Sequence, residues 1–495
     1  MADKKKIAVI GAGLGGLSAA ARLANAGFDV DVFEKNNKPG GKAYEFYNNG
    51  FRFDAGPSLL TMPFVLHDLF SDLDENLEDY VELTQLKNIC KYFWNDGTII
   101  NAYSNVDEFA REIENKTYDS AISVTNYLMY SQKIYDLTAE LFLFKSISDV
   151  KNIFSIHALK TLLQIHKIDS FRTMHQANKS FFKDDKTIQL FDRYATYNGS
   201  NPYKAPATLN IIQHVEYNMG AFISEKGMYS IPKAVYELAR KKGAKFFFNS
   251  KVDRINNDSR KITGLQVERD DKIELKNYDV VISNSDVNYT YEKLIDTKNV
   301  NHKQHEPSSS AIVFYWGTKG EHKELDVHNV LFSNNYKEEF QDLFENKKCN
   351  NDPTIYIYIS SKFNKNDAPE GCENWFVMIN APANYGQNWN SEKTRMREII
   401  INKIKSVLNI DISDRIISET IMTPEDLEKN TSSKYGSIYG ISSNNKYAAF
   451  MREKNHSAKY KGLYFCGGSA HPGGGIPLVL LSGKITADLV VRYEK

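Results

Sequence analysis

The sequence has few cysteines, and none of them belongs to a paired motif. Cys90, Cys349, Cys372 and Cys466 are scattered along 495 residues without C-x-x-C spacing. This distribution argues against a disulfide framework and against a zinc site, and it favours a reducing compartment such as the cytoplasm. We therefore expect no metal site.

The chain also lacks an excess of charge and a long hydrophobic run. Its 62 Lys and Arg residues balance 62 Asp and Glu residues, so no overall field attracts nucleic acid. No apolar run reaches the roughly 20 residues that span a bilayer. Residues 1–6, MADKKK, lead directly into an apolar strand, without the apolar region of a signal peptide. We therefore expect a cytoplasmic protein that is soluble or bound peripherally to a membrane.

Residues 6–34 have the pattern of a dinucleotide-binding unit. An apolar strand leads to Gly11-x-Gly13-x-x-Gly16, a helix of small residues follows, and Glu34 ends a second apolar strand. The three glycines permit a tight turn, close approach of a pyrophosphate, and packing of the helix on the strand. The helix N-terminus favours phosphate, and a carboxylate about 20 residues later accepts a hydrogen bond from a ribose 2′-hydroxyl. The pattern predicts an α/β, Rossmann-like fold that binds a dinucleotide without a 2′-phosphate.

A second glycine-rich turn lies near the C-terminus. Residues 462–477, GLYFCGGSAHPGGGIP, join an apolar strand to an apolar helix. Such glycine density lets backbone lie close to a flat ligand, and the helix start directs N–H groups at a ring oxygen or a phosphate. We expect this turn to form the other half of the cofactor site.

The middle of the chain divides into a helical part and a part rich in strands. From about residue 64 to 219, aromatic and apolar residues recur near helical spacing, among them Ile153, Phe154 and residues 159–165. Lys145, Lys151, Lys160 and Lys167 lie between them. This pattern fits an amphipathic cap with solvated lysines, and it also fits a helical face on anionic lipid. From about residue 302 to 423, β-branched and aromatic runs predict a mixed sheet. We expect a discontinuous cofactor domain (1–75, 220–300 and 430–495), a helical, membrane-associating cap (76–219) and a substrate domain (301–429).

Taken together, the motifs resemble those of the bacterial carotenoid desaturases, FAD enzymes of the phytoene desaturase type that are related in fold to the flavin amine oxidases. The two ends of the chain carry the resemblance through Gly11-x-Gly13-x-x-Gly16 with Glu34, Gly40-Gly41-Lys42, Phe53-Asp54-x-Gly56-Pro57-Ser58 and His471–Pro477. Shorter blocks follow in family order between them, at residues 197–202, 227–229, 281–286, 328–329, 352–354 and 436–440. Residues 41–46 and 53–63 look most like the 1-hydroxycarotenoid 3,4-desaturase branch.

The resemblance implies a non-covalent FAD and assigns residues to it. It places the ADP phosphates at Gly11, Gly13, Gly15 and Gly16 beside Leu14, and the adenine ribose at Glu34 beside Lys35. It places adenine at the backbone of Val252, and pyrophosphate or ribityl contacts at Gly41 and Lys42. The residues assigned to ribityl or flavin contacts are Gly56, Pro57, Ser58, Gly467, Gly468, Gly475, Ile476 and Pro477. Two positions depart from the family pattern. Lys42 stands where relatives commonly have Arg. Many relatives have a carboxylate directly after the first of these glycines, where this sequence continues Gly467-Gly468-Ser469. We interpret Cys466 as a buried thiol rather than a flavin tether.

The implied reaction removes two hydrogens from adjacent carbons of a polyene and extends its conjugation. The flavin accepts a hydride, and a proton goes to a carboxylate, a water or the reduced flavin. Candidate polar groups near the substrate are Asp192, Arg193, Tyr229 and His328, each of which also has a structural interpretation, and the sequence identifies no base. The electron acceptor is expected to be oxygen or a quinone.

The expected substrate is an acyclic 1′-hydroxycarotenoid desaturated at the 3′,4′ bond and delivered from a bilayer. Burying about 40 carbons from water would yield on the order of 30 kcal/mol, beyond the practical binding ceiling of about 20 kcal/mol. A membrane source is therefore the natural one, and a hydroxyl in the channel would need a polar partner. The alternatives are a phytoene or diapophytoene desaturase, a flavin-dependent carotenoid isomerase, and a non-enzymatic isoprenoid-lipid escort protein.

Overall fold

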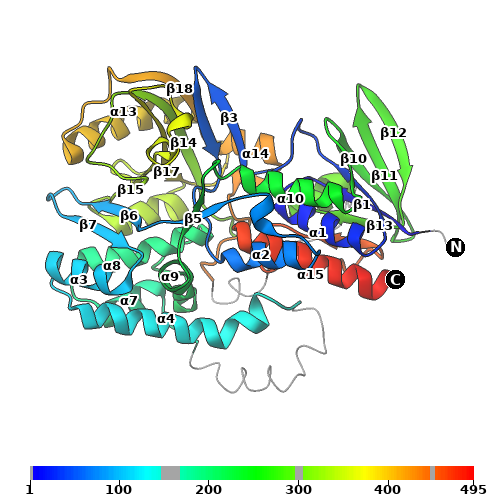
Figure 1. The fold of residues 1–495 in the computed structure, drawn as a ribbon, viewed down its shortest axis with the longest axis horizontal. Helices are drawn as coiled ribbons and strands as arrows, with labels where there is room; N and C mark the ends of the chain where they lie inside the picture. The colour runs from blue at the N-terminus through cyan, green and yellow to red at the C-terminus, as the bar shows by residue number, and fades with distance from the viewer. Residues whose placement is uncertain (1–3, 147–167, 296–304, 446–451) are drawn as a thin grey trace.

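A five-stranded parallel sheet contains the dinucleotide unit. The computed structural model describes residues 4–146, 168–295, 305–445 and 452–495 (Figure 1). The sheet has the order β19-β13-β1-β2-β9, and each neighbouring pair is parallel. Its strands are β1 (Lys6–Ile10), β2 (Asp29–Phe33), β9 (Lys245–Phe247), β13 (Val280–Ser283) and β19 (Leu463–Phe465). Strands from both ends and from the middle of the chain thus form one sheet.

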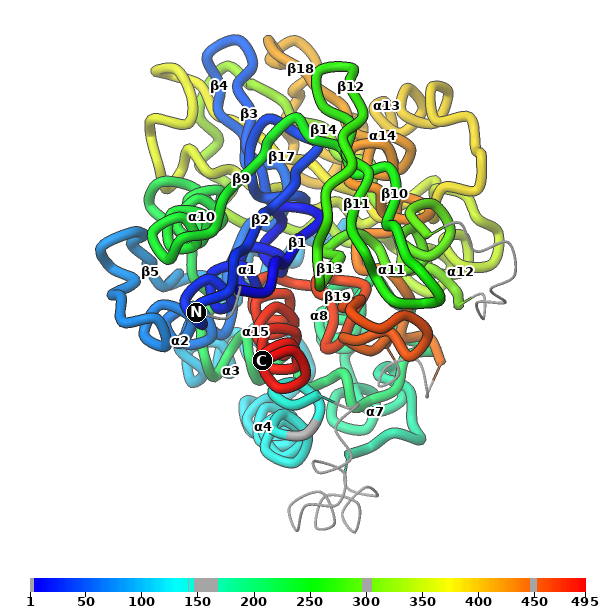
Figure 2. The backbone as a smooth tube through the Cα atoms, turned by 90° about the vertical axis from the view of Figure 1, so that its right-hand side faces the viewer, coloured from blue at the N-terminus to red at the C-terminus, as the bar shows by residue number. Residues whose placement is uncertain are grey.

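Helices from distant parts of the chain cover this sheet. α1 (Leu14–Asn25) packs against α10 (Ser230–Lys241) and α15 (Ile476–Glu494), and Figure 2 shows α15 beside α1. Residues 7–10 of β1 are buried on both faces, as expected of a parallel strand covered on both sides. Beside the sheet lies an antiparallel meander of β10 (Lys251–Asp258), β11 (Lys261–Arg269) and β12 (Lys272–Asn277).

A mixed seven-stranded sheet forms the second body of the fold, as the strand-rich sequence predicts. Its order is β18-β14-β17-β16-β15-β6-β7, and β15 pairs with β6 in parallel. The strands are β6 (Asn88–Phe93), β7 (Ile99–Tyr103), β14 (Ser310–Lys319), β15 (His328–Leu331), β16 (Ile355–Tyr358), β17 (Cys372–Ala381) and β18 (Ile416–Met422). One face packs on α13 (Trp389–Leu408) around Trp316, Ile357 and Trp375. The side chains that alternate with these along each strand point to the opposite face of the sheet.

The prediction that residues 64–219 are mostly helical is wrong over residues 88–103. Two strands, β6 and β7, occupy this stretch and form a hairpin around the turn at Asn95-Asp96-Gly97. Strand β6 also pairs with β15, more than 200 residues later. This long-range pairing overrides the local helical spacing, because strand formation depends on the partner strand as much as on the segment itself.

Apart from the short strand at residues 83–85, the other described residues of the cap are mostly helical, as predicted. The cap contains α3 (Val106–Lys116), α4 (Ala121–Phe142), α7 (Met174–Phe181), α8 (Asp185–Asp192), α9 (Ile211–Gln213), the 3₁₀ turns η3 (Arg193–Asn198) and η4 (Ala207–Asn210), and the π turn η5 (His214–Asn218). Asn105, Ser120 and Thr173 cap α3, α4 and α7 by accepting backbone N–H groups of the first turn. Ile153, Phe154, residues 159–165 and the lysines at 151, 160 and 167 lie outside the described residues. Among the helices that are described, none is long and apolar enough to cross a bilayer.

Several short elements complete the described fold. Two small antiparallel pairs are β3 (Tyr44–Asn48) with β4 (Phe51–Ala55), and β5 (Leu83–Gln85) with β8 (Phe222–Ser224). The remaining helical elements are α2 (Pro63–Ser71), α11 (Val287–Tyr289), α12 (Tyr336–Gln341), α14 (Pro424–Thr431), η1 (Leu77–Asp79), η6 (Thr290–Leu294), η7 (Asp342–Asn346), η8 (Ser360–Lys362), η9 (Lys365–Asp367) and η10 (Lys434–Gly436). The division into three domains at the expected boundaries stays a prediction.

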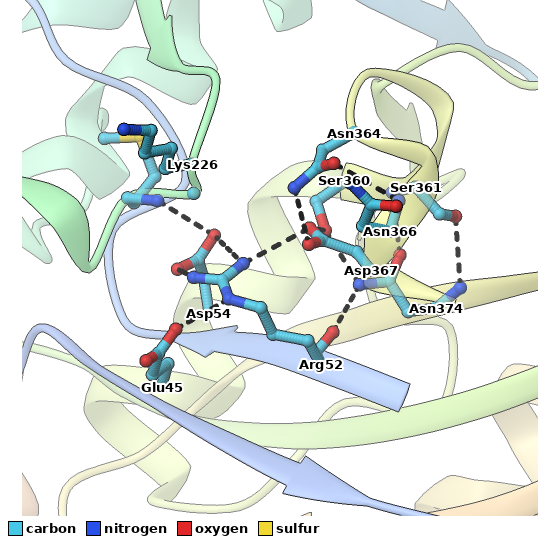
Figure 3. Close-up of polar contacts among 12 residues, drawn as sticks. Glu45, Arg52, Asp54, Lys226, Ser360, Ser361, Asn364, Asn366, Asp367 and Asn374 are labelled. Carbon is cyan, nitrogen blue, oxygen red and sulfur yellow. Dashed lines mark hydrogen bonds and ion pairs between the residues drawn. The ribbon is translucent and has the colours of Figure 1, made fainter. Parts of the chain in front are cut away.

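A buried ionic network joins the β3–β4 hairpin to its surroundings (Figure 3). Arg52 on β4 binds Asp54 through Nη2 at 2.6 Å and Asp367 on η9 through Nη1 at 3.2 Å. Asp54 also accepts the backbone N–H of Tyr229, at 3.1 Å. Because Gly56 and Ser58 follow directly after β4, this network fixes where that segment enters the interior.

Candidate functional site

A cavity of about 1120 Å³ is lined by the parallel sheet, the cap and the seven-stranded sheet. It is larger than the roughly 300–1,000 Å³ of ordinary small-molecule pockets. It therefore has room for a dinucleotide and part of a second ligand.

The cavity collects the predicted cofactor residues from every part of the chain. Those that line it are Gly11, Gly13, Leu14, Gly15, Glu34, Lys35, Gly41, Lys42, Gly56, Pro57, Ser58, Val252, Gly467, Gly468, Gly475, Ile476 and Pro477. Gly16 is the exception, because it packs α1 on β1. A β-carbon at Gly16 would lie 2.3 Å from the oxygen of Gly11 and 3.2 Å from Val9 Cγ1. Gly16 therefore permits close packing of the helix on the strand, which is the role of the third glycine in this motif.

The two glycine-rich turns meet at Asn284, at the carboxyl end of β13. A β-carbon at Gly13 or Gly15 would lie 2.8 or 2.7 Å from the Asn284 side chain, and one at Gly467 would lie 2.6 Å from it. Asn284 Nδ2 also donates to the oxygen of Gly11, at 3.3 Å. Sequence reasoning did not assign Asn284 to the site. The sequence feature that could have identified Asn284 is a polar turn directly after a buried parallel strand, because open α/β sheets bind ligands at that end of their strands.

Glu34 supports the first turn and retains capacity for a ribose. Its Oε2 accepts the N–H of Ala12 at 2.8 Å, and its Oε1 accepts the backbone and side-chain N–H groups of Asn36 at 3.0 and 2.8 Å. Each carboxylate oxygen has two lone pairs, so Oε2 can accept a further bond from a hydroxyl.

Two helix N-termini face the cavity. α1 begins after Gly13 and α15 begins after Gly475, and the first turn of each presents unpaired N–H groups and a positive dipole. A β-carbon at Gly475 would meet no atom of the described residues within 4 Å, so among them this glycine leaves open space at the start of α15. The arrangement fits FAD, which carries a pyrophosphate at its centre and an electron-accepting ring at one end.

Lys42 is a buried cation in the cavity wall. Its Nζ donates to the backbone oxygens of Ser437 at 3.0 Å and Ile438 at 2.7 Å. Burial lowers the pKa of Lys42 to about 8, although the neighbouring Asp286 carboxylate acts in the opposite direction. A pyrophosphate would favour the charged form of this side chain.

Arg452 is a second buried cation in the wall, and sequence reasoning missed it. Its Nη1 donates to the backbone oxygens of Tyr439 at 2.7 Å and Gly468 at 2.9 Å. Burial lowers its pKa to about 10, and among the described residues it forms no ion pair with a carboxylate. No motif surrounds it in the sequence, so only the fold reveals that it lies beneath the second glycine turn.

Cys466 is buried beside Asn284 rather than free in the cavity. Its Sγ donates to Asn284 Oδ1 at 3.6 Å, and burial raises the pKa of the thiol. Both observations disfavour the reactive thiolate. Non-covalent FAD stays our prediction.

Of the four candidate polar residues, the structure brings Arg193 and His328 to the cavity but not Asp192 or Tyr229. Asp192 Oδ1 accepts Asn178 Nδ2 at 2.8 Å, and its Oδ2 lies 2.6 Å from a ring nitrogen of His175. Tyr229 donates its hydroxyl to the oxygen of Pro39 at 3.0 Å, which supports the turn before Gly40. The contacts of these two residues are structural.

Arg193 belongs to a buried cluster in the cap wall. Its Nη2 donates to the Tyr92 hydroxyl at 2.7 Å and lies 3.7 Å from Glu216 Oε1. Glu216 also accepts the hydroxyls of Tyr194, at 2.5 Å, and of Tyr197. Sequence reasoning assigned neither Glu216 nor the tyrosines, because no local motif marks a carboxylate that pairs across helices.

His328 belongs to a second polar group, on the face of the seven-stranded sheet. Its Nδ1 lies 2.7 Å from the Tyr356 hydroxyl, which lies 2.5 Å from Ser58 Oγ. Burial lowers the pKa of His328 to about 3, so the ring is neutral.

The wall around these groups is largely apolar. The sheet contributes Val313, Val330, Phe376 and Met378, and the cap contributes Leu209, Ile211, Ile212 and Val215. A long hydrocarbon chain would be desolvated there without leaving many polar groups unpaired. The described residues contain no cluster of His, Cys, Asp or Glu that would hold a metal ion.

Comparison with known proteins gives full-length matches. The family model described as flavin containing amine oxidoreductase matches residues 14–491. A 1-hydroxycarotenoid 3,4-desaturase of Flavobacterium sp. (strain P99-3) is 44% identical over 491 residues, 98% of this chain and 99% of that protein. A 4,4′-diaponeurosporene oxygenase of Staphylococcus haemolyticus (strain JCSC1435) is 33% identical over 497 residues, 99% of this chain and 98% of that protein.

Solved structures share the fold at low identity. Putrescine oxidase bound to putrescine has a TM-score of 0.64 at 14% identity, with 99% of each chain covered. Cyclohexylamine oxidase from Brevibacterium oxydans has a TM-score of 0.58 at 13% identity, with 99% of this chain and 100% of that chain covered.

These matches confirm the resemblance drawn from the two glycine-rich turns and the α/β fold that it implied. They also agree with the cavity, which residues of both turns and Glu34 line together. The chain belongs to the flavin containing amine oxidoreductases and is an FAD-dependent oxidoreductase.

Proposed function

We propose that the protein is a carotenoid desaturase that acts on the C3–C4 bond of an acyclic 1-hydroxylated polyene. The observation that carries this proposal is the 44% identity, over the full length, to a protein named 1-hydroxycarotenoid 3,4-desaturase. The apolar wall beside the cofactor cradle supports it, because such a wall suits a hydrocarbon chain.

The chain's own residues position the reactants and exclude water. Bound FAD would supply a hydride acceptor for a C–H bond that is too weakly acidic for a side-chain base. Gly475 at the start of α15 leaves room for a flat ring, and the apolar side chains of the sheet and the cap hold the polyene against it. The electron acceptor in this proposal is oxygen or a quinone.

The test is a product assay with carotenoids in liposomes. The purified protein is expected to be yellow and to release FAD on denaturation. A desaturase product loses two hydrogen atoms and absorbs at longer wavelength. A product that gains oxygen would overturn desaturation in favour of oxygenation. Oxygenation is the second candidate, because a relative at 33% identity is named an oxygenase. A product of unchanged mass would indicate an isomerase.

The polyene is proposed to enter from a bilayer at the cap. α4 runs along the lower edge of the molecule in Figure 1, and it exposes Ile122 and Met129 to 71% and 52%. Tyr118 and Phe171, both largely exposed, lie in the same part of the chain. Exposed apolar residues of this size suit the interfacial region of a membrane.

A further inference from the structure

We propose that Ser58, Tyr356 and His328 bind the hydroxyl end group of the substrate. The inference rests on the proposed function and supplies what that function leaves open, namely the polar partner of a hydroxyl inside an apolar channel. All three residues line the cavity.

The three side chains form a relay that ends in an unpaired atom. Ser58 Oγ and the Tyr356 hydroxyl are 2.5 Å apart, and the Tyr356 hydroxyl is 2.7 Å from His328 Nδ1. His328 Nε2 is buried and has no hydrogen-bond partner within the described parts of the chain. A buried polar atom without a partner costs free energy, so it marks a place where a ligand group would be stabilised.

A hydroxyl group suits this relay better than other polar groups. The neutral imidazole donates through one nitrogen and accepts through the other, and Tyr356 and Ser58 each donate and accept. A substrate hydroxyl also does both, so it pairs with the relay in either histidine tautomer. The charge of Arg193 helps to keep the ring neutral, after the larger effect of burial on the pKa of His328.

The position of the hydroxyl in the substrate also favours a binding site close to the flavin. In a 1-hydroxylated chain only C2 separates the carbon that bears the hydroxyl from the C3–C4 bond, so the hydroxyl must bind close to the reacting edge of the flavin. Ser58 belongs to the segment 56–58, which lines the cavity and which the family resemblance assigns to the flavin, and it ties Tyr356 to that segment.

Apolar neighbours continue from the relay across the sheet. Tyr356 pairs with Val330 on one side and with Met378 on the other, and Met378 pairs with Val313. The three neighbours line the cavity with Tyr356. The polar end group and the hydrocarbon chain thus have adjacent places on one face of the sheet.

The Arg193 cluster is the weaker candidate for the same role. Both oxygens of Glu216 accept tyrosine hydroxyls, and Nη2 of Arg193 donates to Tyr92. The members of this cluster therefore satisfy one another more fully than the relay does, although Arg193 Nε is buried and has no hydrogen-bond partner among the residues described.

The test compares Tyr356→Phe and His328→Phe with the control Tyr358→Phe in the FAD-loaded enzyme. Tyr358 is on the same strand and also stacks on His328, with ring centroids 4.9 Å apart, but it does not line the cavity. Each enzyme is assayed with an acyclic 1-hydroxylated carotenoid and with its unhydroxylated counterpart, both in liposomes. FAD content is measured in every preparation as a control for folding.

The expected result is a change in preference. The wild type and Tyr358→Phe should favour the hydroxylated polyene in KM, and Tyr356→Phe and His328→Phe should lower that preference about fivefold to tenfold, the effect of one or two lost hydrogen bonds. The readout is the ratio of the two KM values within each enzyme, so that a general effect of the substitution on the cavity cancels. An unaltered preference in both relay variants at full FAD content would overturn the inference.

A binding titration separates this inference from the proposed function. Without oxygen or a quinone, the reduced, FAD-loaded enzyme cannot accept a further hydride and does not desaturate. The shift in carotenoid absorption on binding then gives an affinity for each polyene. If no carotenoid is converted, the proposed desaturation fails, and the titration still decides the inference. A preference for the hydroxylated polyene that disappears in the two relay variants supports the hydroxyl site, and one that persists overturns it.

Discussion

At the scale of single residues, Lys42 shows how burial changes the chemistry of a side chain. The double-glycine motif predicts a cation near the pyrophosphate, and the structure places Lys42 in the cavity wall. Burial lowers its pKa from the ordinary 10.5 to about 8. The sequence gives no sign of this shift, because it depends on how deeply the folded chain buries the ammonium group.

We predict that FAD affinity falls as the pH rises above about 8. Without FAD, folded Lys42 binds its proton less tightly than unfolded Lys42. Its charge therefore lowers stability below pH 8, and this cost disappears as the pH rises toward 10.5. A pyrophosphate favours the charged form, so FAD binding above pH 8 takes up a proton and weakens by up to about tenfold per pH unit. Flavin fluorescence titrations between about pH 7 and 9.5 measure this dependence.

Lys42→Arg is the control for that prediction. An arginine stays protonated throughout this range, so the affinity of the variant should be nearly independent of pH. The same slope in the wild type and in Lys42→Arg would assign the dependence to another group.

At the scale of elements, the sequence predicted those whose signals are local. The strand, glycine turn and helix from β1 to α1, the strand ending at Glu34 and the turn before α15 all have their cues within a few residues. Strands β6 and β7 were missed because β6 is stabilised by pairing with β15, far along the chain. The cap helices are confirmed, whereas contact between the cap and a membrane stays a proposal.

We predict that replacing Ile122 and Met129 on α4 with Glu weakens membrane binding about tenfold or more. Each apolar side chain of this size contributes roughly 1.5–3 kcal/mol when buried, and a charge at the interface also opposes binding. Co-sedimentation with liposomes that contain anionic lipid measures the effect. Leu275→Glu on β12 is the matched control, because Leu275 is 74% exposed and β12 lies at the opposite end of the molecule from α4 in Figure 1. Equal losses in the variant and the control would contradict docking through α4.

At the scale of the whole molecule, the Arg52 network joins segments that are distant in the sequence. Arg52 contacts Asp54 and Glu45 in its own hairpin and Asp367 on η9. Asp54 in turn accepts the N–H group of Met228, at 3.0 Å. The network therefore holds the segment that leads to Ser58 in a fixed position relative to both sheets.

We predict that Arg52→Met lowers the free energy of unfolding by about 3–5 kcal/mol, because it leaves buried carboxylates without a counter-charge. Urea unfolding followed by circular dichroism measures the loss, and FAD release should accompany it. Arg52→Lys should recover only part of the stability, since an ammonium cannot form the same forked contacts. Arg269→Met on the exposed meander is the control and should change stability by less than about 0.5 kcal/mol. An equally small effect of Arg52→Met would show that the network does not hold the hairpin.

The sequence by itself determined the two glycine-rich turns, the acidic residue after β2, the α/β class and the flavin family, because each depends on backbone conformations that a few neighbouring residues impose. Only the tertiary structure decided that Asn284 joins the two turns, that Arg452 lies beneath the second, and that Ser58, Tyr356 and His328 form one relay. These contacts link residues up to several hundred positions apart. Their existence depends on packing and on the exclusion of water, which no local pattern of residues records.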